Sequence, residues 1–326
     1  MTHDKARATG NGGAADFSPA YVALLASGAL AERARAAERR LADCDLCARA
    51  CHADRIAGVR GVACRMGAEA VVHAFGPHHG EEDCLSGWAG SGTIFFSGCN
   101  LRCVFCQNWE IAWRGDGEAV SAPRLAAIML QLQAMGCHNI NLVSPSHFVA
   151  PILGAVAIAA ERGLRLPLVY NTGGYDSLAA LALLDGVVDI YMPDMKYGDA
   201  AHARTYSRVR DYVRHNQAAV REMHRQVGDL VVGEDGLARR GLLVRHLILP
   251  GGLAGTETVL AFLAEAVSRD TYVNLMDQYR PCHRAAAYPE LDRRPSGRER
   301  EEARELARRH GIRRLDLRAP PARRWW

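Results

Sequence analysis

The pattern of apolar and polar positions after residue 90 alternates between two kinds of segment. Short apolar runs rich in β-branched and aromatic residues are typical of buried strands. They occupy 93–96, 138–143, 166–170, 187–192, 242–249 and 271–276. Longer segments with apolar residues at helical spacing separate or follow them, at 123–135, 151–162, 177–184, 200–227, 256–267 and 299–310. This alternation predicts an α/β fold with a parallel sheet and right-handed crossovers.

Polar or glycine-rich motifs follow the predicted strands at their C-terminal ends. After the strand at 93–96 comes a group of cysteines, and the later strands end in S-P-S-H, N-T-G-G-Y, P-D-M-K, P-G-G and D-Q-Y. In barrel folds the chemistry lies at these strand ends, so we expect the motifs to share one mouth. Six strand–helix units are too few for a closed eight-stranded barrel.

The chain before residue 91 has a different character. Residues 1–16 are polar and rich in glycine and alanine, which predicts a disordered tail. Segment 18–43 predicts helix, with Ser18 as the N-cap, Pro19 in the first turn and a break near Ser27 and Gly28. A short strand is expected at 71–75, and another at 315–317. We therefore divide the chain into a tail (1–16), an N-terminal helical and Cys-rich segment (17–90) and a barrel (91–326).

Composition and charge exclude only a few classes of function. Of the 326 residues, 49% are hydrophobic and 23% charged, which is ordinary for a soluble globular protein. The formal net charge of +4 does not favour nucleic acid as a partner. The longest apolar stretch, 148–160, is interrupted by Pro151 and is too short to span a membrane. The N-terminus lacks an apolar signal region, and the 10 cysteines are clustered, so we expect a reducing, cytoplasmic location.

The first cysteine group follows the strand at 93–96 directly. Cys99, Cys103 and Cys106 have the spacing C-x3-C-x2-C. Three thiolates so close together favour a metal site over disulfides. A closed zinc or iron–sulfur site takes four protein ligands, so three cysteines on a cubane-type cluster leave one iron open. The alternative is three buried cysteines or a zinc clip.

A second group lies upstream. Cys44, Cys47, Cys51 and Cys64 have the spacing C-x2-C-x3-C-x12-C. Four thiolates fit a closed zinc site or an auxiliary iron–sulfur cluster, and the pattern does not choose between them. A structural clip is the preferred interpretation over a catalytic role, and four unmetallated cysteines are the alternative.

The stretch G-C-N-L-R-C-V-F-C-Q-N, with Phe105 at the aromatic position, resembles the radical S-adenosylmethionine (radical SAM) enzymes. Within that superfamily it is most similar to the pyruvate formate-lyase activating enzyme group. The motifs C-D-L-C and N-L-M-D-Q-Y-R-P resemble the branch with an N-terminal Cys-rich segment. The resemblance implies a partial (β/α)6 TIM-like barrel with an N-terminal Cys-rich extension.

The same resemblance implies a cofactor pair and a reaction. A [4Fe–4S] cluster on Cys99, Cys103 and Cys106 would bind S-adenosylmethionine at its open iron. One electron, from a flavodoxin or ferredoxin-type donor, cleaves the C5′–S bond and gives methionine and a 5′-deoxyadenosyl radical that abstracts hydrogen. The substrate is a glycyl radical enzyme to be activated, or another peptide or small molecule. A non-catalytic iron–sulfur scaffold or redox sensor is the alternative from another class.

Candidate cofactor contacts lie at the strand ends. Phe105 would pack beside the adenine or the cluster, and is otherwise a core residue. Asn171, Thr172 and Gly173 could contact the ribose and approach the ligand through backbone, although the glycines could simply form a turn. The Gly-Gly-Glu-like motif that the superfamily uses for the amino group is replaced here by S-P-S-H.

Four charged or titratable residues are further candidates for contacts with the cofactor. Asp194 and Lys196 match a D-x-K pattern of the activating enzymes and suit ribose hydroxyls and the cofactor carboxylate; the alternative is a salt bridge. Arg245 and His246 are adjacent in an apolar strand, so one of them must face the barrel interior. A buried charge there would favour an anionic ligand.

Several weaker candidates remain. Asn274 and Gln278 resemble Arg245 and His246 in position. The loop 76–83 holds two histidines and two glutamates that could bind metal, but a solvated loop is the preferred interpretation. Cys84 either supports a cluster or is a small buried residue. Cys137 and Cys282 stand alone, and Cys282 is either a radical-relay thiol or, as we prefer, a structural cysteine.

Overall fold

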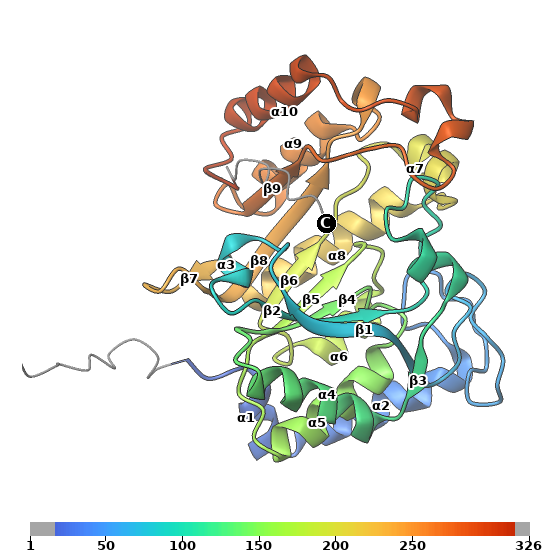
Figure 1. Ribbon diagram of the computed structural model, residues 1–326, viewed down its shortest axis with the longest axis vertical. Coiled ribbons are helices and arrows are strands. Elements are labelled where there is room, and N and C mark those ends of the chain that lie inside the picture. The colour runs from blue at the N-terminus through green and yellow to red at the C-terminus, as the bar shows by residue number, and fades with distance from the viewer. Residues whose placement is uncertain (1–16, 317–326) are drawn as a thin grey trace, which may run out of the picture.

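Residues 17–316 are described in the computed structural model, so the predicted tail at 1–16 lies outside the described residues. Six parallel strands form the centre of one sheet (Figure 1). They are β2 (Ser91–Phe96), β4 (Ile140–Val143), β5 (Leu168–Thr172), β6 (Ile190–Pro193), β8 (Ala238–Leu247) and β9 (Tyr272–Met276). All six predicted strands are confirmed, and neighbouring strands pair in parallel in this order. The expected partial (β/α)6 barrel is therefore confirmed.

Short strands extend both edges of the barrel. β10 (Arg314–Leu315) is parallel to β9, and Leu317 of the predicted strand lies outside the described residues. At the other edge β1 (Ala70–His78) is antiparallel to β2, and β3 (Glu118–Val120) is antiparallel to β1. β7 (Val231–Val232) forms a hairpin with β8. β1 belongs to the sheet although it lies within the predicted N-terminal segment.

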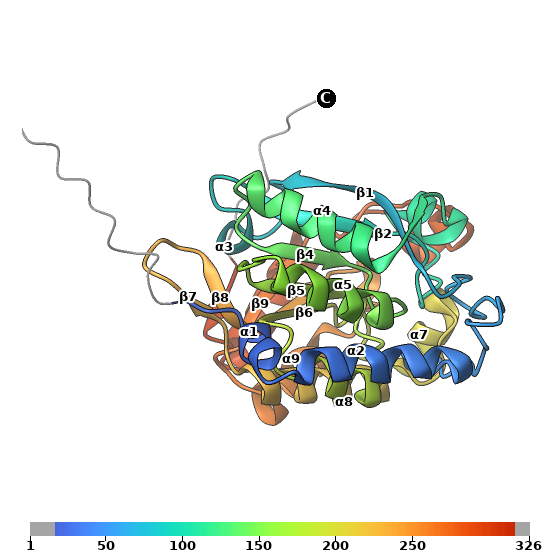
Figure 2. The same ribbon diagram turned by 90° about the horizontal axis from the view of Figure 1, so that it is seen from below.

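Helices cover the outside of the sheet, as Figure 2 shows for α2, α4 and α5. The α-helices are α1 (Tyr21–Ala26), α2 (Ala29–Arg39), α3 (Asp83–Ser86), α4 (Ala122–Ala134), α5 (Val149–Glu161), α6 (Leu178–Leu184), α7 (Ala200–Ser207), α8 (Tyr212–Val227), α9 (Thr256–Ala266) and α10 (Gly297–Arg309). Short 3-10 or π turns occupy Arg40–Asp43, Glu110–Arg114, Pro250–Gly252, Ala285–Ala287 and Pro289–Leu291. The main apolar core lies between these helices and the strands.

Helix boundaries follow local capping chemistry. Ser121 accepts a hydrogen bond from the Arg124 amide at the start of α4, and Ser296 forms a capping box with Glu299 at α10. Two predictions were wrong. Segment 200–227 is two helices, because Arg208 takes a left-handed conformation (φ 55°) and ends α7. Ser18 is not an N-cap, since α1 begins only after Ala20.

The predicted solvated loop at 76–83 was also wrong, at both of its ends. β1 extends to His78, opposite the first residue of β2. Glu81 and Glu82 are then buried at 6% and 0% exposure. Together with α3 they form what we call the plug (residues 81–86), which enters the barrel from the N-terminal ends of its strands. Cys84 packs there among apolar residues of β5, β6 and β8, as a small buried residue.

The start of the N-terminal helices is tied to the barrel by one carboxylate. Asp189, fully buried before β6, accepts hydrogen bonds from the amides of Ala20 (2.8 Å) and Leu168 (2.9 Å). Burial outweighs these hydrogen bonds and raises the pKa of Asp189 to about 7.

This raised pKa predicts a pH dependence. Between about pH 4, the ordinary aspartate pKa, and about pH 7, the folded state holds a proton that the unfolded state has lost. Stability contributed by Asp189 should therefore be fully present below pH 4 and fall by roughly 1.4 kcal/mol per pH unit until pH 7. Urea unfolding of metal-free wild type and Asp189→Asn should show this slope as a difference between them. Parallel pH curves for the two proteins would contradict it.

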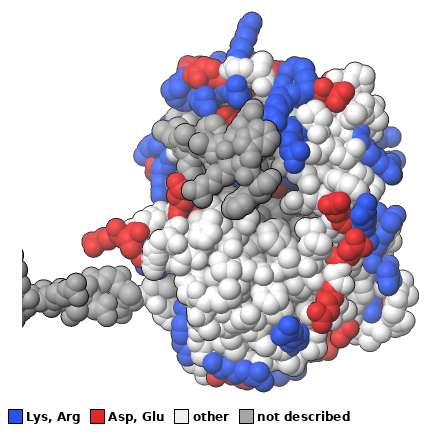
Figure 3. All heavy atoms as spheres, viewed as in Figure 1, with Lys and Arg blue, Asp and Glu red and all other residues white. Residues whose placement is uncertain are grey.

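The surface adds two observations. Figure 3 shows Lys and Arg mixed with Asp and Glu around the edges of one face, and an area without charged residues below the grey atoms. Within residues 17–316, none of the helices combines the length and the apolar character needed to cross a membrane.

Candidate functional site

The first cysteine group occupies the loop that follows β2. Burial raises the pKa of Cys99 to about 11 and of Cys106 to about 12, and the neighbouring Cys103 thiol adds to both shifts. Burial also raises the pKa of Cys103. The three side chains are therefore neighbours; Cys103 is buried, and Cys99 and Cys106 are partly exposed. A four-iron cluster takes one thiolate per iron, so neighbouring positions of this kind fit its ligand set.

Lys196 brings a positive charge to the same place. Its ammonium interacts electrostatically with all three cysteines and forms an ion pair with Asp194. Burial is the largest influence on Lys196 and disfavours its charge, but Asp194 more than compensates, so the pKa of Lys196 is raised. The structure thus brings the D-x-K pair to the cysteine loop, both as the predicted ion pair and facing the metal-ligand candidates.

The end of β5 packs directly against that loop. A Cβ at Gly173 would lie 2.8 Å from Cδ1 of Leu101, so glycine is needed for this close approach. The Thr172 hydroxyl donates to Asp176 (2.7 Å) and is hydrogen-bonded to Ser146 (2.9 Å). Thr172 is therefore held inside the protein, whereas Asn171 is 8% exposed. The Ser and His of S-P-S-H are likewise used internally, since His147 bonds the Ser97 carbonyl at 2.9 Å.

Tyr212 of α8 fixes two strand ends relative to each other. Its hydroxyl lies 2.9 Å from the Gly173 carbonyl and 3.0 Å from the Asp194 carbonyl, and it accepts from the Lys196 amide at 3.0 Å. The loops after β5 and β6 are therefore held together beside the cysteine loop. This tyrosine was missed from the sequence because it lies within a predicted helix, away from the motifs at the strand ends.

The side chains of Arg245 and His246 lie on opposite sides of β8. Arg245 faces the interior, where it pairs with Glu81 and with Glu82 (2.6 Å). The expected anionic partner is therefore a pair of the protein's own carboxylates, and Asn274 donates to Glu82 at 2.6 Å as well. Burial raises the pKa of Glu82, but Arg245 outweighs it and lowers the value to about 2.

His246 is fully buried on the opposite side of β8. Its Nδ1 donates to the Met195 carbonyl (2.6 Å), and its Nε2 accepts from the Thr256 hydroxyl (3.0 Å). Burial lowers its pKa to about 4, so it is neutral. Both ring nitrogens are used inside the protein, which leaves His246 no position for a cofactor. It supports the loop that carries Lys196 instead.

Phe105 lies in an aromatic cluster under the cysteine loop. Its ring makes edge contacts with Tyr197 (6.3 Å between centroids) and Tyr279 (5.9 Å). The loop is also held by Ser207, whose hydroxyl donates to Cys103 Sγ at 2.9 Å. Ser207 could not be found from the sequence, because it lies where the helical pattern was read as continuous.

The comparisons with known proteins agree with this geometry. Residues 93–234 match the family model described as the radical SAM superfamily. The chain contains a radical SAM domain. An uncharacterized protein of Methanocaldococcus jannaschii, MJ0674, is 31% identical over 244 residues, which cover 72% of this chain. The chain spans 66% of that relative's length, just under two thirds.

A solved structure shows a more distant likeness to this chain. It is the crystal structure of Streptococcus suis SuiB bound to precursor peptide SuiA, with 12% sequence identity and a TM-score of 0.46. The match covers 67% of this chain and 46% of that one. We draw nothing about the substrate of this chain from it.

The second cysteine group is also assembled, at the edge of the radical SAM domain. Burial raises the pKa of Cys47 to about 12, and the neighbouring Cys64 and Cys44 thiols add to the shift. Burial raises the pKa of Cys64 too, with Cys44 and Cys51 adding to it. Cys64 therefore lies near each of the other three cysteines of the group. Across residues 17–316, however, no three His, Cys, Asp or Glu side chains converge on one metal position.

Cys137 and Cys282 belong to neither cysteine group. Cys137 is buried at the N-terminal side of the sheet, where a Cβ at Gly92 would lie 3.0 Å from it. Cys282 is half-buried beside His283, which stacks on Trp109 (5.2 Å) near the cysteine loop.

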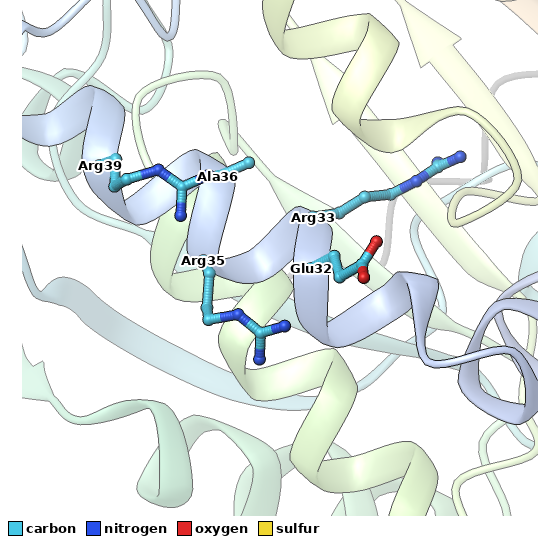
Figure 4. Close-up of a pocket in the computed structure, with 5 residues that line it drawn as sticks. All are labelled: Glu32, Arg33, Arg35, Ala36 and Arg39. Atoms are coloured by element: carbon cyan, nitrogen blue, oxygen red, sulfur yellow. The ribbon is translucent and has the colours of Figure 1, made fainter.

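An open depression on α2 contains none of the predicted site residues (Figure 4); it is lined by Glu32, Arg33, Arg35, Ala36 and Arg39.

Proposed function

We propose that this protein is a radical SAM enzyme that cleaves S-adenosylmethionine reductively and uses the product to abstract hydrogen. The observation that carries the proposal is the position of Lys196, a partly buried cation that faces Cys99, Cys103 and Cys106 at the mouth of the barrel. When bound, a [4Fe–4S] cluster supplies one electron to the sulfonium, giving methionine and a 5′-deoxyadenosyl radical that takes a hydrogen atom from the substrate.

The chain's own residues then have distinct tasks. Cys99, Cys103 and Cys106 would each hold one iron. Lys196 would bind the carboxylate of S-adenosylmethionine, because an ammonium in a buried site attracts an anion strongly. Asp194 would hold Lys196 in place and is near enough to share the ribose hydroxyls. Asn171, Gly173 and Phe105 stay candidates for ribose and adenine contacts; Thr172 supports them through Asp176 and Ser146.

For the substrate, we propose a backbone glycine of a partner enzyme, as in the activating enzymes that the cysteine motif resembles. Modification of another peptide or of a small molecule is the second candidate, and a non-catalytic scaffold or redox sensor is the third. The electron would come from a flavodoxin or ferredoxin-type donor, and the thiol-rich sites suit the reducing cytoplasm. We also propose that residues 17–90 form a Cys-rich extension to the radical SAM barrel at 91–326.

Lys196→Met should weaken binding of S-adenosylmethionine by roughly 10- to 100-fold, because one charge-assisted hydrogen bond is lost. Iron content should not change. Titration of the reduced cluster with S-adenosylmethionine, followed by electron paramagnetic resonance, measures this affinity. The double variant Asp194→Asn/Lys196→Met removes both charges and controls for the carboxylate left unpaired by the single change. Wild-type affinity in both variants would exclude Lys196 from the cofactor site.

The three candidate functions predict different outcomes in one experiment. The reduced protein and S-adenosylmethionine are mixed with a glycyl radical enzyme that is encoded near the gene of this protein. Activation gives a glycyl doublet in the electron paramagnetic resonance spectrum. Release of 5′-deoxyadenosine without a doublet favours another substrate. A stable cluster that releases none, with or without the partner, favours the scaffold.

A further inference from the structure

A buried arginine lies beside the second cysteine group. Arg55 is 1% exposed, and its Nη1 is 3.6 Å from Cys44 Sγ. Its other hydrogen bonds go to backbone carbonyls, those of His147 (2.6 Å from Nη1) and Gly67 (2.9 Å from Nε), and its Cζ lies 5.8 Å from the centroid of the Phe148 ring. Within residues 17–316 it forms no ion pair with a carboxylate. Its hydrogen bonds are satisfied, but its charge is not balanced.

A buried cation without a counter-charge is costly, since carbonyl dipoles compensate only part of the lost hydration. Two of the groups near Arg55 that can become negative are cysteines. Besides touching Cys44, Arg55 interacts electrostatically with Cys64. A neutral thiol pair would leave the guanidinium unbalanced, whereas metal-bound thiolates would balance it.

Gly61 shows that the local backbone leaves room for these sulfurs. A Cβ at this position would lie 2.5 Å from Cys64 Sγ and 3.9 Å from Cys51 Sγ. The backbone of Gly61 is not in the left-handed region, so what glycine provides is space. The Gly61 amide donates to the Met66 carbonyl (3.1 Å), and its carbonyl accepts from the Arg65 amide (2.8 Å), which closes a tight knuckle around Cys64.

We propose that Cys44, Cys47, Cys51 and Cys64 hold one metal–tetrathiolate centre whose negative charge is balanced by Arg55. Four thiolates carry more negative charge than a Zn²⁺ ion or a [4Fe–4S]²⁺ core carries positive charge, so either centre is an anion. This proposal does not depend on the reaction proposed above, because it concerns metal binding alone.

The centre would also support the cysteine loop of the radical SAM domain. Asn100, next to Cys99, donates to the Tyr175 carbonyl at 2.7 Å, and the Ala48 amide donates to the same oxygen at 3.3 Å. The Asn100 side chain also contacts Cys47. One asparagine therefore links the two cysteine groups.

Metal and sulfide analysis of the anaerobically purified full chain tests the proposal. The triple variant Cys99→Ala/Cys103→Ala/Cys106→Ala should retain metal, and a further Cys44→Ala/Cys47→Ala change should remove it. About one zinc ion per chain would identify a zinc centre; about four iron ions with sulfide would identify a cluster. Absence of metal from the triple variant, with the four thiols of the second cysteine group reactive, would overturn the proposal.

The role of Arg55 is tested separately in the same triple background. Arg55→Gln should speed removal of the metal by a chelator by roughly 10- to 100-fold, as expected for a neighbour that stabilises metal ligands. Arg55→Lys keeps the charge and should lose less, which also guards against a folding failure of the glutamine variant. Arg60→Gln, an exposed arginine of the same segment, is the matched control. Equal chelation rates for Arg55→Gln, Arg55→Lys and Arg60→Gln would contradict the counter-ion role.

Discussion

Cys103→Ala is expected to reduce 5′-deoxyadenosine formation to background while the protein keeps its fold. Cys103 is one of three cysteines on the loop after β2, and without it the proposed cluster would lack one of its ligands. Its thiol is buried and accepts a hydrogen bond from Ser207, so the change removes few contacts. Chromatographic quantitation of 5′-deoxyadenosine, iron content and circular dichroism together measure the effect.

Cys137→Ala is the matched control for that change. Cys137 is also buried, but it lies at the N-terminal side of the sheet and contacts none of the site residues. Its activity and iron content should match the wild type. Substantial 5′-deoxyadenosine formation by Cys103→Ala, or equal losses in both variants, would contradict the assignment of Cys103 as a cluster ligand.

The second large effect is expected from Arg245→Met. The arginine is the common partner of Glu81 and Glu82 in the plug, and Glu82 is fully buried. Removing it leaves two buried carboxylates without a cation, which should lower the free energy of unfolding by about 3–5 kcal/mol. Urea unfolding of the metal-free protein at roughly neutral pH measures the loss. Arg293→Met breaks a surface pair with Glu299 and should cost less than about 1 kcal/mol.

The same pair predicts the sign of a pH effect. The folded-state pKa of Glu82 is lowered to about 2, so its contribution to wild-type stability is present above the ordinary glutamate pKa and is lost as pH falls toward 2. In Arg245→Met burial is opposed only by hydrogen bonds such as the one from Asn274, so the pKa of Glu82 should rise. The variant should therefore recover stability relative to wild type as the pH is lowered. A destabilisation that stays constant with pH would argue against uncompensated carboxylates.

The strands of the barrel could be predicted because each is an apolar run that packs on both faces, and such runs stand out from their surroundings. The Cys99, Cys103 and Cys106 loop could be predicted because its spacing is local. The plug could not. Glu81 and Glu82 look like a solvated loop, and their burial depends on Arg245, which is more than 160 residues away in the chain.

The residues of the site could be predicted only where they lie close together in the sequence. Asp194 and Lys196 formed a recognisable pattern, and the structure brings them to the cysteine loop. Ser207 and Arg55 act through contacts with residues on other segments, and no local pattern distinguishes them from other serines and arginines. His246 was misjudged because adjacent strand residues face opposite sides, and only the structure shows which side holds the cofactor candidates.

The central claim is tested most directly by one assay on the reconstituted wild-type protein. Reduction with dithionite in the presence of S-adenosylmethionine should release 5′-deoxyadenosine and methionine in equal amounts, and omission of the reductant should prevent it. An intact [4Fe–4S] cluster that binds S-adenosylmethionine or ignores it, but never releases 5′-deoxyadenosine, would contradict the proposed radical SAM activity.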